Sequence, residues 1–360
     1  MKNKEFSDIK KSTIDAIYDA QKIAFAPVVF QATRLLKKYG ILEYIEKRGA
    51  AGALLSEISD STGISIYGVN VLLETGLSAD LVKLKDDYFF LTKTGYVIIH
   101  DEMTSVNMDF IHDVCYEGLF HLDESIKCEK PAGLKVFGKW ATVYEALSKL
   151  PENVKESWFN FDHFYSDSAF PAALPHIFED KPSKIMDIGA NTGKFSIQML
   201  QYNRNVSVTV LDLPGQLEMA MANFEKHKIA HRVTPFPINI LDRNIDFPTE
   251  HDAIWMSQFL VCFSKEEVTH ILKRAAKALT KNGFVYILDT FWDKQKYDAA
   301  AFCLINTSPY FTTIANGNSK MYQSSEIIEC AKNAGLALDQ EYENLGISHT
   351  LLKFRQSISE

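Results

Sequence analysis

The first strong pattern along the chain is helical. Apolar residues between positions 14 and 39 recur every three or four residues, which places them on one face of a helix. Pro27 predicts a break or kink in this helix, because proline cannot donate a backbone hydrogen bond and its ring clashes with the preceding turn. The apolar excess of these opening residues also suggests a surface that packs on a second copy of the chain.

A helix, a turn, a second helix and a hairpin follow. Ser56 and Ser65 are placed to cap the two helices, and the apolar runs 81–84 and 88–91 predict the strands of the hairpin. This order is typical of a winged-helix domain and raises the possibility of a DNA-binding regulator. However, residues 64–76, which would form the recognition helix, contain no Lys or Arg, and phosphate binding requires cations there. We therefore favour a domain that packs on protein.

Residues 101–180 form a mostly helical and unusually aromatic stretch. Aromatic side chains at helical spacing are typical of a core and also of a pocket wall. Asp162, His163 and Asp167 lie within the aromatic cluster that begins at Trp158, and burying such polar groups without partners would be costly. This segment is therefore predicted to line a site.

Strands and helices alternate from residue 184 to residue 288. Repeated βα units with right-handed crossovers predict a doubly wound, Rossmann-like parallel sheet with helices on both faces. Short loops, one of them holding Asn282 and Gly283, separate the units. The strand candidates 337–342 and 350–354 add a C-terminal antiparallel hairpin. The predicted fold class is α/β, with an N-terminal, mainly helical, winged-helix-like domain.

One turn in the alternating region carries a candidate binding site. An apolar run ends in Asp187, and Gly189 and Gly193 follow just before a helical pattern. Such a turn lies at the carboxyl end of a strand, where ligands bind, and glycine lets backbone come close to a ligand. The next strand candidate ends in Asp212, whose carboxylate could accept hydrogen bonds from both hydroxyls of a ribose. Together these residues predict a nucleoside site.

Several other classes of function are disfavoured. Asn191 and Lys194 occupy glycine positions of the dinucleotide fingerprint, so the turn is poorly shaped for a pyrophosphate. A net charge of -8 argues against a nucleic-acid partner. Five widely spaced cysteines without a C-x-x-C pair indicate neither disulfides nor a zinc site and favour a cytoplasmic setting. Polar first residues and the lack of a long apolar run predict neither export nor a membrane span.

The ordered set of motifs resembles class I S-adenosylmethionine-dependent methyltransferases. Within them it is similar to the two-domain small-molecule O-methyltransferases of plant caffeate and flavonoid pathways and of bacterial antibiotic pathways. The likeness covers nearly the whole chain and rests on a glycine motif, a ribose-binding acid, an adenine-side motif and two strand signatures, at residues 187–193, 212–214, 236–242, 251–254 and 282–284.

The resemblance implies a domain plan and a cofactor. Residues 1–105 would be a winged-helix-like dimerisation domain, residues 106–180 a helical linker region that lines the active site, and residues 181–360 the Rossmann-like domain that binds S-adenosylmethionine. The implied partners are a small-molecule acceptor and a second copy of the chain. The residues themselves give no reason to expect a metal, nucleic acid or membrane partner, because no His, Asp or Glu set shows a recognisable ligand spacing, the net charge is -8 and no long apolar run is present.

The resemblance also implies site residues, each of which could instead be plain core. The cofactor set departs from the family at Asn239, where the usual residue is Asp, and at Phe263, where it is often Trp. The implied cofactor residues are Asp187, Gly189, Gly193, Asp212, Leu213, Asn239, Ile240, Phe263 and Tyr165. The implied substrate pocket comprises Tyr144, Trp158, Phe161, Asp162, Val261, Cys262, Asn306 and Tyr310.

The catalytic base is the main departure from the family pattern. The family's Leu-His-Asp-Trp segment matches residues 260–263, so Val261 stands at the position of the base and Cys262 at that of its acidic neighbour. Valine cannot accept a proton. The family's orienting Glu is also missing, because residues 321–323 read Met-Tyr-Gln. Asp289 remains at the end of the fifth strand, and His163 is the best candidate for a relocated base.

Methyl transfer does not depend on that base alone. Positioning supplies about 7–11 kcal/mol of a barrier, whereas a general base adds about 10²- to 10⁴-fold in rate. Three accounts stay open. The first is O-methylation of an acidic oxygen or with a relocated base, on a flat or conjugated acceptor that suits the aromatic wall. The second is another reaction with the same cofactor, such as decarboxylation or hydroxylation. The third is a non-catalytic dimeric binding protein.

Overall fold

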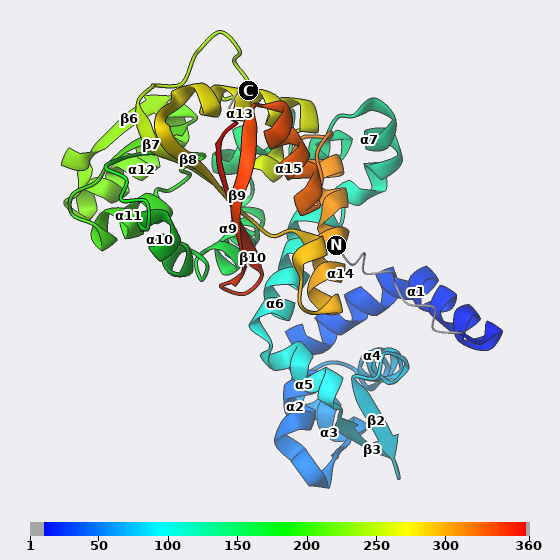
Figure 1. Cartoon of the computed structure of the whole chain (residues 1–360). Helices are drawn as coiled ribbons and strands as arrows, with labels where there is room; N and C mark the ends of the chain where they lie inside the picture. Colours follow the sequence, from blue (N-terminus) through cyan, green and yellow to red (C-terminus); the bar gives the residue numbers. More distant parts are fainter. Residues whose placement is uncertain (1–10, 358–360) are drawn as a thin grey trace. The chain divides into compact units, whose positions relative to one another are not determined.

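The computed structural model describes residues 11–357, and Figure 1 traces the chain. The chain divides into two compact units, residues 1–111 and 112–360. Most of the segment 106–180, which the sequence sets apart as a linker region, therefore belongs to the same unit as the large sheet.

Helices make up most of the first unit, and a three-stranded antiparallel sheet with the order β1-β3-β2 completes it. Leu36, Leu73 and Phe89, from two helices and a strand, meet in its hydrophobic core. Asp86 and Asp87 have positive φ angles of 49° and 64°, which suit the tight turn of the β2–β3 hairpin and confirm that prediction. The elements are α1 (Thr13–Lys38), α2 (Ile41–Arg48), β1 (Ala53–Leu54), α3 (Leu55–Thr62), α4 (Ile66–Ser78), β2 (Val82–Lys85), β3 (Tyr88–Leu91), α5 (Lys93–His100) and α6 (Glu102–Asp109).

One local prediction in this unit is wrong in part and another is wrong. Pro27 lies inside the continuous helix α1, so the predicted break is absent, and the predicted kink stays a prediction. The carbonyl that loses its donor belongs to Ile23, which is exposed, so water can replace the missing bond. Ser56 does not cap α3, because the backbone N–H of Leu54 instead donates to the Glu57 carboxylate at 3.0 Å. The cap predicted at Ser65 is confirmed.

A seven-stranded sheet with the order β6-β5-β4-β7-β8-β10-β9 forms the centre of the second unit. Its first five strands are parallel, and β10 pairs antiparallel with both β8 and β9. The predicted α/β class with a C-terminal hairpin is therefore confirmed. The strands are β4 (Lys184–Ile188), β5 (Ser207–Asp212), β6 (Val233–Pro237), β7 (His251–Ser257), β8 (Leu279–Asp289), β9 (Leu336–Leu345) and β10 (His349–Gln356).

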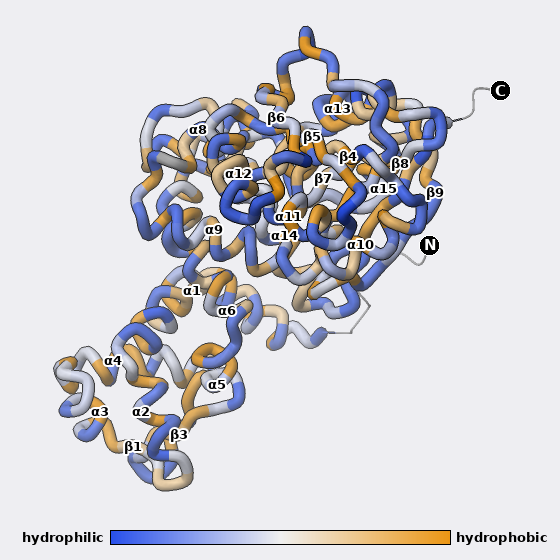
Figure 2. The backbone as a smooth tube through the Cα atoms, turned by 90° about the vertical axis from the view of Figure 1, so that its left-hand side faces the viewer, coloured by the Kyte–Doolittle hydropathy of each residue, from blue (hydrophilic) through white to orange (hydrophobic). Residues whose placement is uncertain are grey.

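Helices cover both faces of this sheet, and the alternation of side chains along each strand decides which face a residue serves. Ala253 and Trp255 of β7 pack with α10, α11 and α12, whereas Ile254 and Met256 pack with α13 and α15. In Figure 2 orange, hydrophobic stretches lie along the central strands β4, β5 and β7. The covering helices are α10 (Phe170–Phe178), α11 (Lys194–Tyr202), α12 (Pro214–Lys226), α13 (Lys265–Ala278) and α15 (Ser324–Asn333).

Asn282 and Gly283 lie within β8, not in a loop as the sequence predicts. A Cβ on Gly283 would come within 3.0 Å of the carbonyl oxygens of His251 and Asp252 in the neighbouring strand. The glycine therefore permits close approach of two strands, and a residue type that usually marks a turn serves here as a spacer.

Additional helices in this unit are α7 (Leu122–Cys128), α8 (Val143–Ala146), α9 (Glu152–Ser166) and α14 (Asp298–Tyr310). Tyr310 ends α14 and Phe311 begins the π-helical turn η9 (Phe311–Ala315), so the chain stays helical beyond Asn306. None of the helices within residues 11–357 is long and apolar enough to cross a membrane.

Candidate active site

The predicted strand-turn-helix at residues 184–202 is present. Gly189 and Gly193 have φ angles of 77° and 80°, and Asn191 between them has a φ of 50°. The N–H of Gly189 donates to the carbonyl of Leu211 at 2.9 Å, which ties the turn to the end of β5. Three residues in the left-handed region give a tight turn, and glycine adopts that conformation without strain.

A neighbouring aromatic ring also requires glycine at position 189. A Cβ at this position would lie 2.2 Å from the ring of Phe259, which follows β7. The sequence predicts only that Gly189 makes room for a ligand. The structure adds that an aromatic ring occupies one side of the glycine.

A substitution at this glycine tests the contact. Gly189→Ala should destabilise the protein by about 2 kcal/mol or more, since alanine is strained at a φ of 77° and collides with the ring of Phe259. In a Phe259→Ala background the same change should cost less, because only the backbone strain remains. Denaturation midpoints of the four proteins in this double-mutant cycle measure the coupling. Equal losses of unfolding free energy in both backgrounds would contradict the contact between residue 189 and the Phe259 ring.

Asp212, at the end of β5, is held by the turn itself. Its Oδ2 accepts the N–H of Asn191 at 2.8 Å, and its Oδ1 accepts the N–H of Leu213 at 2.7 Å. Burial raises the pKa of this carboxyl, and the two backbone bonds oppose the increase. A carboxylate has about four acceptor sites. Each oxygen of Asp212 therefore keeps capacity for one further donor.

The carboxylate of Asp187 contacts the protein itself and is not placed to bind a ligand directly. Its carboxylate is buried, and its Oδ2 accepts the hydroxyl of Ser196 in α11 at 2.6 Å. Burial raises the pKa of Asp187 to about 7, while the Ser196 bond favours the ionised form. This hydrogen bond joins β4 to α11, the helix that follows the turn, so Asp187 stabilises the turn from within the protein.

Three buried polar atoms beside the turn have no hydrogen-bond partner among the described residues. They are Asn191 Oδ1, Ser257 Oγ and Gln258 Oε1. Such atoms are rare in folded proteins, because a buried polar atom without a hydrogen bond costs free energy. Each of the three is therefore a candidate to bind a ligand or a water. The sequence analysis missed Ser257 and Gln258, although their position at the carboxyl end of a central parallel strand is the available signal.

The residues predicted on the adenine side lie in two environments. Ile240 is buried and its carbonyl accepts Arg274 Nη1 at 2.6 Å, whereas Asn239 is exposed and its Oδ1 accepts the N–H of Leu241 at 3.0 Å. Phe263 is buried, with its ring edge-on to that of Phe259 at 4.8 Å between centroids. Leu213 begins α12 as its N-cap.

The structure brings four predicted pocket residues together from four elements. Tyr144 of α8, Asp162 of α9, Cys262 of the 3-10 turn η7 (Leu260–Cys262) and Tyr310 of α14 lie close enough to shift one another's pKa. We call these four residues the pocket cluster. Burial raises the pKa of Cys262 to about 12 and those of both tyrosines well above their usual range. Tyr310 also accepts the indole N–H of Trp158 at 2.7 Å.

Asp162 and His163 are neighbours in α9 but differ in surroundings. Burial, and then the charge of Asp167, raise the pKa of Asp162 to about 6. Burial and Lys194 lower the pKa of His163, against the effect of Asp167. The Nδ1 atom of His163 lies 3.9 Å from carboxylate oxygens of both aspartates. His163 is therefore neutral near pH 7, and Asp162 is mostly ionised.

Asp289 ends β8 inside the protein. Its side chain is buried, its Oδ1 accepts the N–H of Thr290 at 2.8 Å, and burial raises its pKa to about 7. Val261 is also buried, at the position where the family pattern has its base. His349, which the sequence analysis missed, begins β10 next to Thr350, the strand partner of Asp289. Burial lowers the pKa of His349 to about 3, so its ring is neutral.

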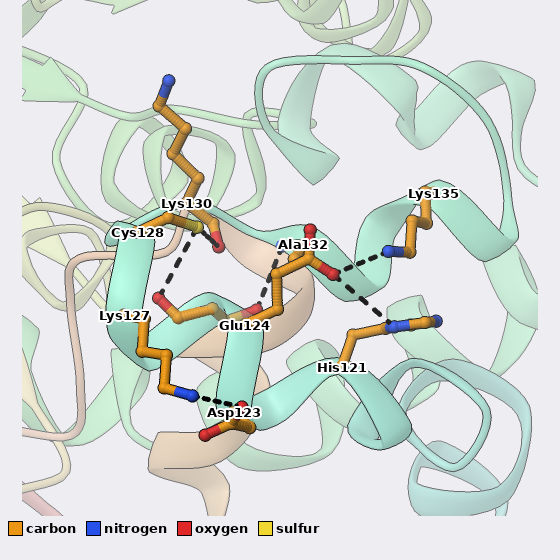
Figure 3. Close-up of polar contacts among 9 residues, drawn as sticks. His121, Asp123, Glu124, Lys127, Cys128, Lys130, Ala132 and Lys135 are labelled. Carbon is orange, nitrogen blue, oxygen red and sulfur yellow. Dashed lines mark hydrogen bonds and ion pairs between the residues drawn. The ribbon is translucent and has the colours of Figure 1, made fainter.

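Other predicted or considered residues lie elsewhere. Asn306 is exposed and its amide donates to the carbonyl of Phe302 in the same helix at 2.8 Å. Phe161 packs on Tyr165, with ring centroids 5.1 Å apart. His121 lies just before α7, with its Nδ1 3.8 Å from the Glu124 carboxylate (Figure 3). Within residues 11–357 no group of three or more His, Cys, Asp or Glu side chains could hold a metal ion.

Comparison with known families agrees with this geometry. Residues 18–89 match the Dimerisation2-like domain, and residues 176–337, which contain the turn, Asp212 and the end of β8, match the O-methyltransferase domain. The chain is a methyltransferase of the O-methyltransferase type. The sheet of this methyltransferase and its preceding helical unit follow the order of these two domains.

Individual relatives of this methyltransferase are distant in sequence. It is 22% identical over 317 residues to an L-tyrosine C(3)-methyltransferase of Streptomyces lavendulae, covering 87% of this chain and 85% of the relative. It is 21% identical over 307 residues to a bacteriochlorophyllide d C-20 methyltransferase of Chlorobaculum tepidum, covering 81% and 85%.

Its fold is that of solved methyltransferases. An O-methyltransferase from neocarzinostatin biosynthesis (NcsB1), in complex with S-adenosylmethionine and 2-hydroxy-5-methyl naphthoic acid, superimposes with a TM-score of 0.66 at 18% identity, covering 91% of this chain and 95% of that one.

Proposed function

We propose that this methyltransferase binds S-adenosylmethionine and methylates a small aromatic or conjugated acceptor. The observation that carries the proposal is the turn after β4, where the Asn191 N–H donates to a carboxylate, Asp212, that has acceptor capacity to spare. The match of residues 176–337 to the O-methyltransferase domain supports it.

The residues about the turn fit such a cofactor. Asp212 would accept hydrogen bonds from the ribose hydroxyls, and the backbone from Gly189 to Asn191 would face the methionine part. The partnerless Asn191 Oδ1, Ser257 Oγ and Gln258 Oε1 offer acceptors where a ligand with several N–H and O–H groups needs them. Ile240 and Asn239 would lie about the adenine. The bound cofactor supplies a methyl group activated by a sulfonium charge.

The acceptor would bind at the pocket cluster. Tyr144 and Tyr310 supply aromatic surface, and their hydroxyls lie near the polar groups Asp162 and Cys262. Pockets of this kind, mostly apolar with a few placed polar groups, suit small organic ligands. His163 and Asp289 remain the residues predicted for proton transfer.

A labelled-methyl assay tests the proposal. Purified protein is incubated with S-adenosylmethionine carrying a labelled methyl group and a panel of phenols and aromatic carboxylic acids. We expect label in an organic product together with S-adenosylhomocysteine. A product without label would favour decarboxylation or hydroxylation, and binding of the cofactor without any product would favour a binding protein. Failure to bind the cofactor at all would refute the proposal.

Methylation of a ring carbon beside a hydroxyl is a second candidate. Two specific observations favour it: the relatives from Streptomyces lavendulae and Chlorobaculum tepidum are named for methylation at C(3) and C-20, and Val261 stands where O-methyltransferases have a base. The position of the methyl group, read from the NMR spectrum of the labelled product, separates O-methylation from C-methylation.

A homodimer formed through the first unit is part of the proposal. This unit matches the Dimerisation2-like domain. Its helix α1 exposes Ile14, Ile17, Ile23 and Phe25, each more than half accessible, and apolar surface of this kind marks protein contacts. Helix α4, where a DNA-binding winged helix would carry cations, has no Lys or Arg. The cytoplasmic setting stays a prediction.

A further inference from the structure

Asp162 lies on the face of α9 that meets Tyr310, and His163 lies on the neighbouring face. Trp158, one helical turn before Asp162 on the same face of α9, donates to the Tyr310 hydroxyl at 2.7 Å. The charge of Asp162 acts on Tyr144, Cys262 and Tyr310, which come from three other elements. His163 instead stacks on Phe159, one turn earlier on its own face of α9, with ring centroids 5.9 Å apart. The charges of Lys194 and Asp167 act on both residues. Consecutive residues of a helix do not share a face. The carboxylate of Asp162 is therefore the acidic group that α9 directs toward the predicted acceptor.

The Asp162 carboxylate is also free to take a proton. It forms no hydrogen bond with the described residues, and the nearest basic atom is His163 Nδ1 at 3.9 Å. Lys194, the neighbouring cation, is paired with Asp167 at 2.8 Å. The Asp162 side chain keeps 29% of its surface accessible.

Asp289 differs from Asp162 on both of these counts. Only 3% of its surface is accessible, and one of its carboxylate oxygens is bonded to the N–H of Thr290. A base has to reach the proton that it removes, and the oxygen that accepts this proton must be free of other hydrogen bonds until then. Asp162 meets this requirement, and Asp289 does so less well.

We propose that Asp162 is the catalytic base, the group that takes the proton released when the acceptor is methylated. This inference rests on the proposed function of the same site. It replaces the missing family base at position 261 by a carboxylate from a different element, which also explains how valine can be tolerated there.

The step balances for either position of the methyl group. In O-methylation the acceptor hydroxyl gives its proton to Asp162, an oxygen lone pair forms the new bond to the methyl carbon, and the carbon–sulfur bond breaks with its electron pair left on sulfur. In C-methylation the ring carbon forms the new bond and the proton that leaves that carbon goes to Asp162. One proton is released in both cases, and the products are the methylated acceptor and a neutral thioether.

The surroundings of Asp162 suit this role near neutral pH. A general base works best when its pKa lies near the operating pH, and burial raises the pKa of Asp162 to about 6. The titratable groups that face it are Asp167, which raises this pKa, Lys194, which lowers it, and His163, Tyr144, Cys262 and Tyr310, which are neutral near pH 7. Below about pH 6 the carboxyl is protonated and the base is lost.

Asp162→Asn tests the proposal in the full-length protein. We expect kcat/KM for a phenol that the unmodified protein methylates to fall about 10²- to 10⁴-fold, with affinity for S-adenosylmethionine unchanged. In the unmodified protein kcat/KM should rise with pH through about 6, and the variant should lose this rise. A phenol acidic enough to be ionised at the assay pH should restore much of the variant's turnover, because its proton is already gone.

Matched variants separate this role from rival ones. Asp123→Asn makes the same chemical change in α7, on an exposed carboxylate paired with Lys127 (Figure 3), and should leave the rate and its pH dependence unchanged. If His163→Gln removes the rise with pH and Asp162→Asn does not, the base is His163 and the proposal is wrong.

Direct titration gives a readout independent of turnover. Carbon NMR of the labelled aspartate carboxyls should show one resonance that titrates near pH 6 and is absent from Asp162→Asn. A carboxyl at position 162 that titrates near the ordinary value of about 4 would overturn the proposal even if methyl transfer is observed. Failure of the unmodified protein to bind S-adenosylmethionine would instead overturn the proposed function beneath it.

Discussion

Asp212→Ala is expected to weaken binding of S-adenosylmethionine at least about 100-fold. Hydrogen bonds to a charged group contribute about 1.5–3 kcal/mol each, and the substitution removes two that the ribose would make. It also removes the acceptors for the N–H groups of Asn191 and Leu213, which hold the turn in shape. Isothermal titration calorimetry with S-adenosylmethionine and S-adenosylhomocysteine measures the loss.

Asp252→Ala is the matched control for this experiment. Asp252 lies near the beginning of β7, at the end of the parallel strands opposite to Asp212, and accepts the N–H groups of Ser183 and Lys184 at 2.9 and 3.1 Å. Its removal should lower stability and leave cofactor affinity unchanged. Equal losses of affinity in both variants would mean that Asp212 acts only through the stability of the sheet.

Trp255→Ala is expected to destabilise the protein by about 3–5 kcal/mol. Trp255 lies in β7 and is 1% exposed; its ring stacks on that of Phe195 at 3.9 Å with an interplanar angle of 8°. Phe170 contacts it edge-on. Truncation would leave a cavity between the sheet and α11, the helix that begins at the cofactor turn. The midpoint of chemical denaturation measures the change.

Two further variants make the result interpretable. The indole nitrogen of Trp255 has no hydrogen-bond partner among the described residues, so Trp255→Phe should cost much less than Trp255→Ala. Phe120→Ala truncates an aromatic side chain that is 83% exposed and should change stability by less than about 0.5 kcal/mol. If Trp255→Ala lowers the free energy of unfolding by no more than Phe120→Ala does, the stacked core does not stabilise the turn.

Most of the fold could be predicted from local sequence patterns. The strand that contains Asp187, the two glycines and Asp212 are close in sequence, and their spacing is sufficient to predict a strand, a turn and a ligand-facing carboxylate. The terminal hairpin was predictable for the same reason, because strand alternation and a turn are local signals. The break at Pro27 was wrongly predicted because the effect of a proline depends on the exposure of the carbonyl four residues earlier, which only the folded helix reveals.

Contacts between distant residues were not predictable from the sequence. Gly189 and Phe259 are 70 positions apart, and nothing in either segment indicates that the ring fills the space beside the glycine. Trp158 and Tyr310 are separated by 152 positions and share a hydrogen bond. The direction of Asp162 within α9 likewise follows from how that helix packs against α8 and α14. Residue types at these positions were recognised as polar or aromatic, but their pairing required the structure.

The central claim is that the turn after β4 and the carboxylate at the end of β5 hold the methyl donor. A crystal structure of the protein grown with S-adenosylhomocysteine tests it most directly. The account predicts density along the backbone of Gly189–Asn191 with both ribose hydroxyls on Asp212. Density for the compound at another place, or none at a saturating concentration, would contradict it.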